Sequence, residues 1–177
     1  MKIYNVTKLL PLLISIALLL ILTACGGGGG GSDEDEETTL DPQAQQVTVT
    51  LGLQGNATPL VGSVDLDVVL PDGFVLATDS SGQATAAALT FLVAGATGAA
   101  NYLPATATAS GKINAGIIKT DGFPGNADLL QISRTYAAGA SLPTANDFMA
   151  TVVASDLNGA TLAGISERIS INTQSVP

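Results

Sequence analysis

The feature that most constrains the fold is a strict alternation of apolar and polar residues in two early stretches of the chain. Residues 47–53, VTVTLGL, place an apolar side chain at every second position, and residues 63–70, SVDLDVVL, repeat the pattern. Successive side chains of a β-strand point to opposite faces, so a period of two predicts two half-buried strands. Asp65 and Asp67 are expected to face water. The inward set comprises Val47, Val49, Leu51, Leu53, Val64, Leu66, Val68 and Leu70.

Short apolar segments separated by glycine, proline and aspartate continue to the end of the chain. The alanine-rich stretch 84–103 shows no helical stripe and is interrupted by Gly95 and Gly98, so we interpret it as strand. The fold class that we expect is therefore all-β: an antiparallel two-sheet β-sandwich of the jelly-roll type with about nine strands. The predicted strands cover residues 47–53, 63–70, 74–77, 84–93, 106–109, 112–118, 129–136, 148–154 and 167–171.

Two connections have recognisable local chemistry. PTANDF, residues 143–148, predicts one helical turn with Thr144 or Asn146 as its cap. DLNG, residues 156–159, predicts a hairpin turn through Asn158 and Gly159. The alternative for DLNG is half of a calcium loop, although the further ligands and the distal glutamate of such a loop are absent.

The residue inventory excludes most enzyme classes. The chain has no histidine, no tryptophan and a single cysteine, Cys25, so disulfides, Ser-His-Asp triads and zinc sites built from histidine or thiolate are excluded. Its net charge is -9, which makes nucleic acid a poor partner. We expect a protein that is not an enzyme and has no catalytic residues.

The first residues have the pattern of an export signal. Lys2 and Lys8 precede the apolar run 9–22, LLPLLISIALLLIL, which is short for a membrane span and typical of a signal-peptide core. LTAC, at Leu22 to Cys25, resembles the lipobox of bacterial lipoproteins. The resemblance implies a signal peptide over residues 1–24, acylation of Cys25, and attachment to the outer membrane on its periplasmic or cell-surface side. The alternative is a simple secretory signal cut near Ala24.

The segment that follows Cys25 lacks apolar residues that could pack. Six consecutive glycines and the acidic run 33–37, DEDEE, predict a flexible, solvated tether over residues 25–46. The acidic run could instead bind cations. One folded domain is expected over residues 47–177.

Three stretches together resemble a known superfamily. They are the two opening strands, the middle SGKINAGIIKTDGFPGNADLLQISRTY, and the closing TANDFMATVVASDLNGATLAGI. They look like the cohesin-type β-sandwich superfamily, which also includes carbohydrate-binding modules. The resemblance implies a non-catalytic module that binds a dockerin-like protein or a polysaccharide, with calcium as the one ion to consider. The alternative is an envelope spacer or adhesin without a specific ligand.

Five side chains are candidate contacts for a ligand or partner. Asp65 and Asp67 share one strand face about 7 Å apart, close enough to contact a cation or a protein partner, or to be only a solvated face. Tyr102 and Tyr136 are the residues that could stack on a sugar. Phe123 lies in TDGFPGN, which is either an exposed recognition loop or a turn with Phe123 tucked over the sandwich edge. No metal ligands are predicted.

Overall fold

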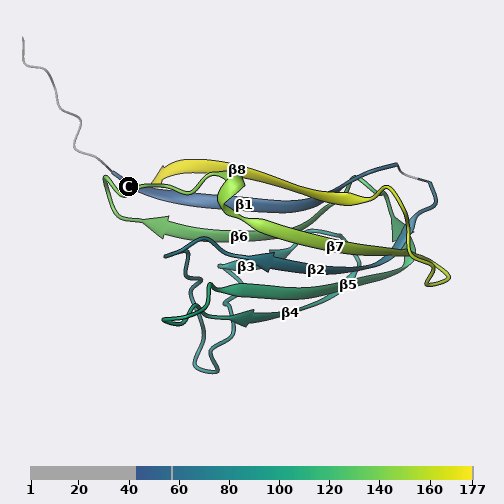
Figure 1. Cartoon of the computed structure of the whole chain (residues 1–177), viewed down its shortest axis with the longest axis horizontal. Coiled ribbons are helices and arrows are strands. Elements are labelled where there is room, and N and C mark those ends of the chain that lie inside the picture. Colours follow the sequence, from purple (N-terminus) through teal and green to yellow (C-terminus); the bar gives the residue numbers. More distant parts are fainter. Residues whose placement is uncertain (1–42, 57, 177) are drawn as a thin grey trace, which may run out of the picture. The chain divides into compact units, whose positions relative to one another are not determined.

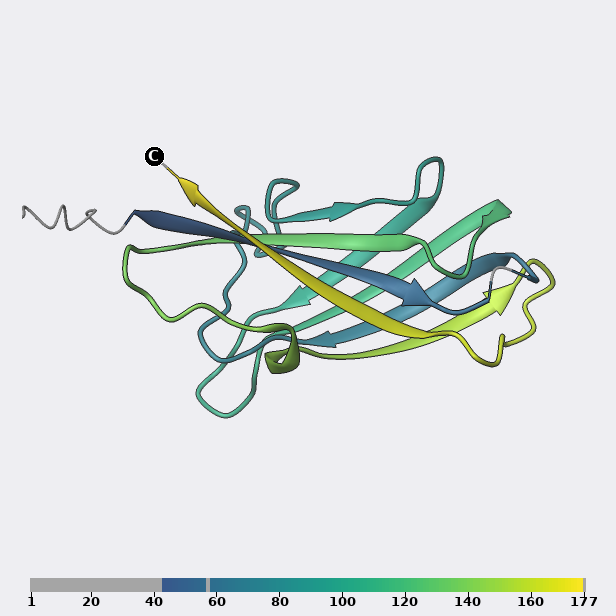
Figure 2. The same cartoon turned by 90° about the horizontal axis from the view of Figure 1, so that it is seen from above.

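A computed structural model describes residues 43–56 and 58–176 (Figures 1 and 2). The predicted signal peptide, Cys25 and the tether up to residue 42 lie outside the described residues. The described part contains eight strands and one short 3₁₀ helix: β1 (Ala44–Gln54), β2 (Val61–Val69), β3 (Leu89–Phe91), β4 (Thr97–Leu103), β5 (Lys112–Phe123), β6 (Asp128–Tyr136), η2 (Ala145–Asp147), β7 (Met149–Asp156) and β8 (Ser166–Val176).

The strands form two antiparallel four-stranded sheets that pack together. One sheet has the order β3-β6-β1-β8 and the other has the order β4-β5-β2-β7. The pairs β1–β8, β2–β7, β3–β6 and β4–β5 are nested, as in a long hairpin wrapped into two layers, which is the jelly-roll pattern. The predicted all-β antiparallel sandwich is confirmed, with eight strands in the described residues instead of about nine.

The core lies between the two sheets and contains the residues that the alternation predicted. Val47, Val49, Leu51 and Leu53 of β1 are at most 1% exposed, and Val64, Leu66, Val68 and Leu70 are at most 2% exposed. Asp65 and Asp67 are exposed on the opposite face of β2. The period of two therefore assigned both faces of these strands correctly.

Several strand predictions were wrong. Residues 74–77 are not a strand, although Phe74 and Leu76 are buried while their neighbours are exposed, because this connecting segment packs across the core without a ladder partner. Residues 106–109 form a single bridge between Thr106 and Ala109. Of 84–93 only Leu89–Phe91 is strand, and β4 was missed as a separate strand because its small residues, TGAANYL, give a weak pattern.

Strand ends also differ from the prediction. β1 begins at Ala44, so residues 44–46, which we assigned to the tether, belong to the sheet. Gln45 and Gln46 pair with β6 and β8, and Ala44 pairs with β8, because backbone hydrogen bonds form regardless of side-chain polarity. β5 continues through Phe123, which shortens the connection to β6.

The two local predictions at turns were correct. Ala145–Asp147 forms a single 3₁₀ turn with Thr144 at its N-cap, and the Asp147 carboxylate accepts hydrogen bonds from the Thr144 N–H (2.7 Å) and hydroxyl (2.9 Å). At 156–159 the Asp156 carboxylate accepts from the backbone N–H groups of Asn158 and Ala160, and Gly159 has a φ of +84°. A left-handed glycine after a turn is typical of a hairpin with a bulge.

Candidate functional site

The outer faces of the two sheets differ in chemistry. The outer face of β3-β6-β1-β8, which we call the polar face, carries uncharged hydrogen-bonding side chains along most of its length. The register places on it Gln46, Thr48, Thr50, Gln131, Ser133, Thr135, Ser170, Asn172 and Gln174. Such a surface is well solvated and offers little apolar area to a partner.

The outer face of β4-β5-β2-β7, which we call the mixed face, combines exposed aliphatic side chains with carboxylates. Leu103, Ile118, Met149 and Val153 are 46%, 59%, 65% and 53% exposed. The register arranges the face in four rows: Leu103-Lys112-Val69-Met149, Asn101-Asn114-Asp67-Thr151, Ala99-Gly116-Asp65-Val153 and Thr97-Ile118-Ser63-Ser155. Exposed apolar side chains gathered on one face are typical of interaction surfaces.

Asp65 and Asp67 lie in the two middle rows of the mixed face. The amide of Asn114 donates a hydrogen bond to Asp67, its register partner on β5. Asp65 lies between Gly116, which has no side chain, and Val153, so its carboxylate stands over bare backbone and aliphatic surface. The two carboxylates that the sequence singled out therefore share one face, with Asp65 the more available to a partner.

The mixed face continues into a hollow at one end. A depression of about 350 Å³ is lined by Ser63 and Ile118 of the last row and by Leu157, which is 51% exposed. Lys119 and Asp156 also line this depression. A depression beside a flat face, with exposed aliphatic side chains in its wall, is the kind of feature into which a partner inserts an anchoring side chain.

The structure buries two of the candidate contacts, which corrects the expectation that Tyr102 could stack on a sugar and selects the tucked alternative for Phe123. Tyr102 is 2% exposed because it faces the core from β4, and its hydroxyl oxygen accepts a hydrogen bond from the Leu76 N–H at 3.2 Å. Phe123 is 3% exposed at the end of β5. Neither ring is a surface platform, and Phe123 adopts the tucked arrangement.

Tyr136 lies at a pocket together with an arginine that the sequence analysis missed. The pocket, of about 630 Å³, is called the end pocket and is lined by Asp72, Arg134, Tyr136, Leu142, Pro143 and Asp147, among others. The Arg134 guanidinium carbon lies 4.6 Å from the Tyr136 ring centroid and 6.0 Å from that of Phe74. Burial raises the pKa of the Tyr136 hydroxyl, so it stays protonated at neutral pH.

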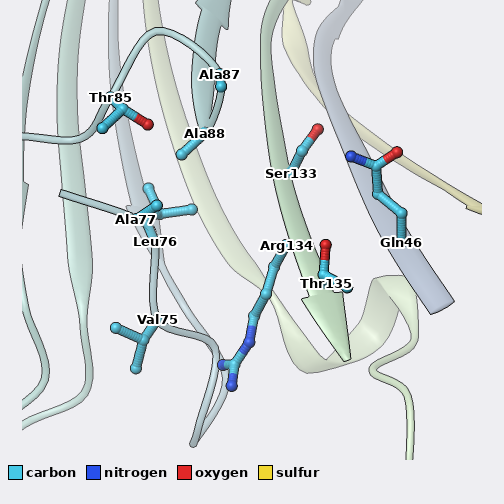
Figure 3. A pocket seen from close by; sticks show the side chains of 10 residues that line it. All are labelled: Gln46, Val75, Leu76, Ala77, Thr85, Ala87, Ala88, Ser133, Arg134 and Thr135. Atoms are coloured by element: carbon cyan, nitrogen blue, oxygen red, sulfur yellow. The ribbon is translucent and has the colours of Figure 1, made fainter. Parts of the chain in front are cut away.

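A second hollow, of about 420 Å³, adjoins Arg134 at the edge of β6. Figure 3 shows the Arg134 side chain reaching from β6 toward the segment that carries Val75, with Ser133 and Thr135 directed elsewhere. The signal that could have found Arg134 is the alternation in β6. Continuing from the buried Leu130 and Ile132 by steps of two places Arg134 and Tyr136 on the inward side.

The described residues show no metal centre. They contain no group of three or more histidine, cysteine or acidic side chains that could hold a metal ion, and Asp156 uses its carboxylate within its own turn. Nor does that part of the chain include a helix with the length and apolarity needed to cross a membrane. No known family model, curated protein or solved structure matches the chain.

Proposed function

We propose that the chain is a lipoprotein, anchored through acylated Cys25 to the outer membrane, that displays the sandwich as a non-catalytic module for binding a protein partner. The anchor rests on the lipobox-like LTAC and the apolar run before it. Two or more acyl chains would give stable attachment, whereas one chain would give only marginal binding. The binding activity agrees with the cohesin-type resemblance of the sequence.

The single observation that carries the binding function is the contrast between the two outer faces. The mixed face exposes Met149, Val153, Ile118 and Leu103. The outward positions of β1, β6 and β8 on the polar face carry uncharged polar residues along most of their length instead. An aliphatic surface left in water on one sheet and avoided on the other is expected where a partner covers it.

The chemistry of the mixed face indicates what a partner presents. Asp65 is a free carboxylate beside aliphatic Val153, so a lysine or arginine flanked by apolar side chains is complementary to it. Gly116 and Ala99 keep the centre low, which permits close approach of a helix or strand. An apolar side chain of the partner would fill the hollow at Ile118 and Leu157.

The size of the face limits the area that a partner can cover on it. Four strands spaced about 4.8 Å apart and seven residues long cover about 19 Å by 23 Å, or roughly 440 Å². A standard interface uses about 800 Å² of each partner. A partner must therefore also contact the flanking loops, or the complex is a transient one.

Affinity capture from the producing cell's envelope and secreted proteins tests the proposal. The full-length protein, immobilised from detergent, is compared with a D65K/D67K variant and with an N172K/Q174K control. The control changes two residues at the same spacing on the polar face. We expect a protein captured by the wild type and the control but lost with D65K/D67K, and its purified form to bind the wild type in calorimetry.

Equal recovery by all three proteins would remove the mixed face from the proposal. Recovery of no protein would favour glycan binding or the spacer function. Repeating the capture with a calcium chelator asks whether a dockerin-like, calcium-loaded partner is involved, because such a partner would be released.

A further inference from the structure

The end pocket contains a charged side chain at an inward-facing position of the sheet, where the neighbouring inward-facing side chains are apolar. Arg134 lies directly across from Val47 in the β1–β6 register, and Val47 is 0% exposed. The side chain two residues before it, Ile132, is also 0% exposed. Arg134 therefore points inward at the end of the sandwich, where an aliphatic residue would satisfy the packing.

The guanidinium is not neutralised within the described residues. Lys119 and Arg168 form ion pairs with Asp121 and Asp128, whereas Arg134 forms none. Its Nη1 is buried and has no hydrogen-bond partner. A buried donor without an acceptor is unfavourable, so the stability of the domain does not explain an arginine at this position.

Two carboxylates line the same pocket without pairing with Arg134. Asp72 and Asp147 are both exposed. Hydrogen bonds from Thr144 hold the pKa of Asp147 below its ordinary value of 3.8, so this group is ionised at neutral pH. The pocket therefore presents a charged donor and two charged acceptors that are not paired with one another.

Part of the remaining wall is apolar or aromatic, and Ser141 adds a hydroxyl to it. Leu142 and Pro143 are half-buried in the connection between β6 and η2, and Tyr136 lies beneath Arg134. Tyr136 in turn packs on Phe74, with ring centroids 6.4 Å apart. These contacts hold Tyr136 and Arg134 in place, as a preformed site requires.

We propose that the end pocket binds a neutral pyranose unit of a glycan. Each sugar hydroxyl both donates and accepts a hydrogen bond, so a pyranose can accept from Arg134 and donate to Asp72 and Asp147 at the same time. Its C–H face matches the apolar wall at Leu142 and Pro143. An anionic ligand fits less well because both carboxylates would repel it. This site is separate from the mixed face and does not depend on the proposed protein-binding function.

Nuclear magnetic resonance titration of the full-length protein in detergent micelles tests the proposal. The neutral probes are the methyl glycosides of glucose, galactose, mannose and N-acetylglucosamine, and the charged probes are methyl glucuronide, acetate and glycine. A single sugar unit is expected to bind in about the millimolar range. We expect at least one neutral glycoside to shift the Arg134 Nε–H and the amides near Asp72 and Asp147 in a saturable way.

Two variants and a matched control locate the binding. Asp72→Asn and Arg134→Met each remove one charged partner, and each should weaken the glycoside by about ten- to a hundredfold. Asp121→Asn changes an exposed aspartate of β5 and should leave the affinity unchanged. Asp72 is exposed, so Asp72→Asn tests the pocket without changing a side chain that faces the core.

Three results would overturn the proposal. The first is the absence of a saturable shift with every neutral glycoside. The second is binding of the charged probes alone, which would make the pocket an anion or amino-acid site. The third is glycoside binding that Asp72→Asn leaves unchanged, which would place the sugar elsewhere on the protein.

Discussion

Replacement of Arg134 by methionine should stabilise the domain. Methionine keeps most of the side-chain volume and removes the buried, unpartnered Nη1, whose desolvation costs about 1–3 kcal/mol. The substitution also removes the attraction of the guanidinium to the Tyr136 and Phe74 rings, worth about 1 kcal/mol. The net expectation is a gain of about 1 kcal/mol in the free energy of unfolding, or about 4 °C in Tm.

Thermal unfolding followed by circular dichroism at neutral pH measures this change. The matched control is Arg168→Met, which removes an arginine of β8 whose partner Asp128 is also exposed. Exposed ion pairs contribute about 0–1 kcal/mol, so the control should leave the Tm unchanged or slightly lower. A Tm that falls by several degrees in Arg134→Met would refute the reasoning, because it would show that the guanidinium stabilises the end of the sandwich.

Three further predictions address the core, the anchor and the turns. Leu66 is 2% exposed and should not tolerate aspartate, because an unpaired buried carboxylate costs more than about 4 kcal/mol. Leu66→Asp should therefore lose its β-sheet circular dichroism, while the control Thr151→Asp on the outer face should keep it. Cys25→Ser should move the protein from the membrane to the soluble fraction, and its retention in membranes would contradict acylation. Hydrogen bonds from turn residues hold the pKa of Asp79 and of Asp156 below the ordinary value of 3.8. Their stabilisation is therefore complete above pH 3.8 and lost as the pH falls through the lowered pKa values, and carboxyl-carbon titrations with midpoints at or above 3.8 would count against these turns.

Local periodicity explains how much of the fold could be predicted. In residues 47–53 of β1 and 64–68 of β2 the inward apolar residues are two positions apart, so Leu51 and Leu66 were assigned to the core without knowledge of their neighbours. The same alternation led to a wrong strand prediction at residues 74–77. This connecting segment packs across the core with every second side chain buried, but it pairs with no strand. β4 was not predicted as a separate strand because alanine and glycine contribute little to a pattern of alternating hydrophobicity.

The candidate site was predicted less completely. Asp65 and Asp67 were placed on one exposed face, since they lie on a single strand. Tyr102 was considered a surface ring for a sugar and Phe123 was predicted to be either exposed or tucked over the sandwich edge, because burial of an aromatic ring depends on which strands cover it. Arg134 was overlooked although it lies two residues beyond the buried Ile132, because a charged residue at the end of a strand ordinarily points to water.

The sequence by itself determined the fold class, the faces of the first two strands and the chemistry of the turns at Thr144 and Asp156. These properties depend on residues close together in the chain. Only the tertiary structure decided that Asp65 lies between Gly116 and Val153, and that Asp72, Arg134 and Asp147 line one pocket. The physical reason is that side-chain direction is a local property of a strand, whereas its neighbours depend on pairing between strands distant in sequence.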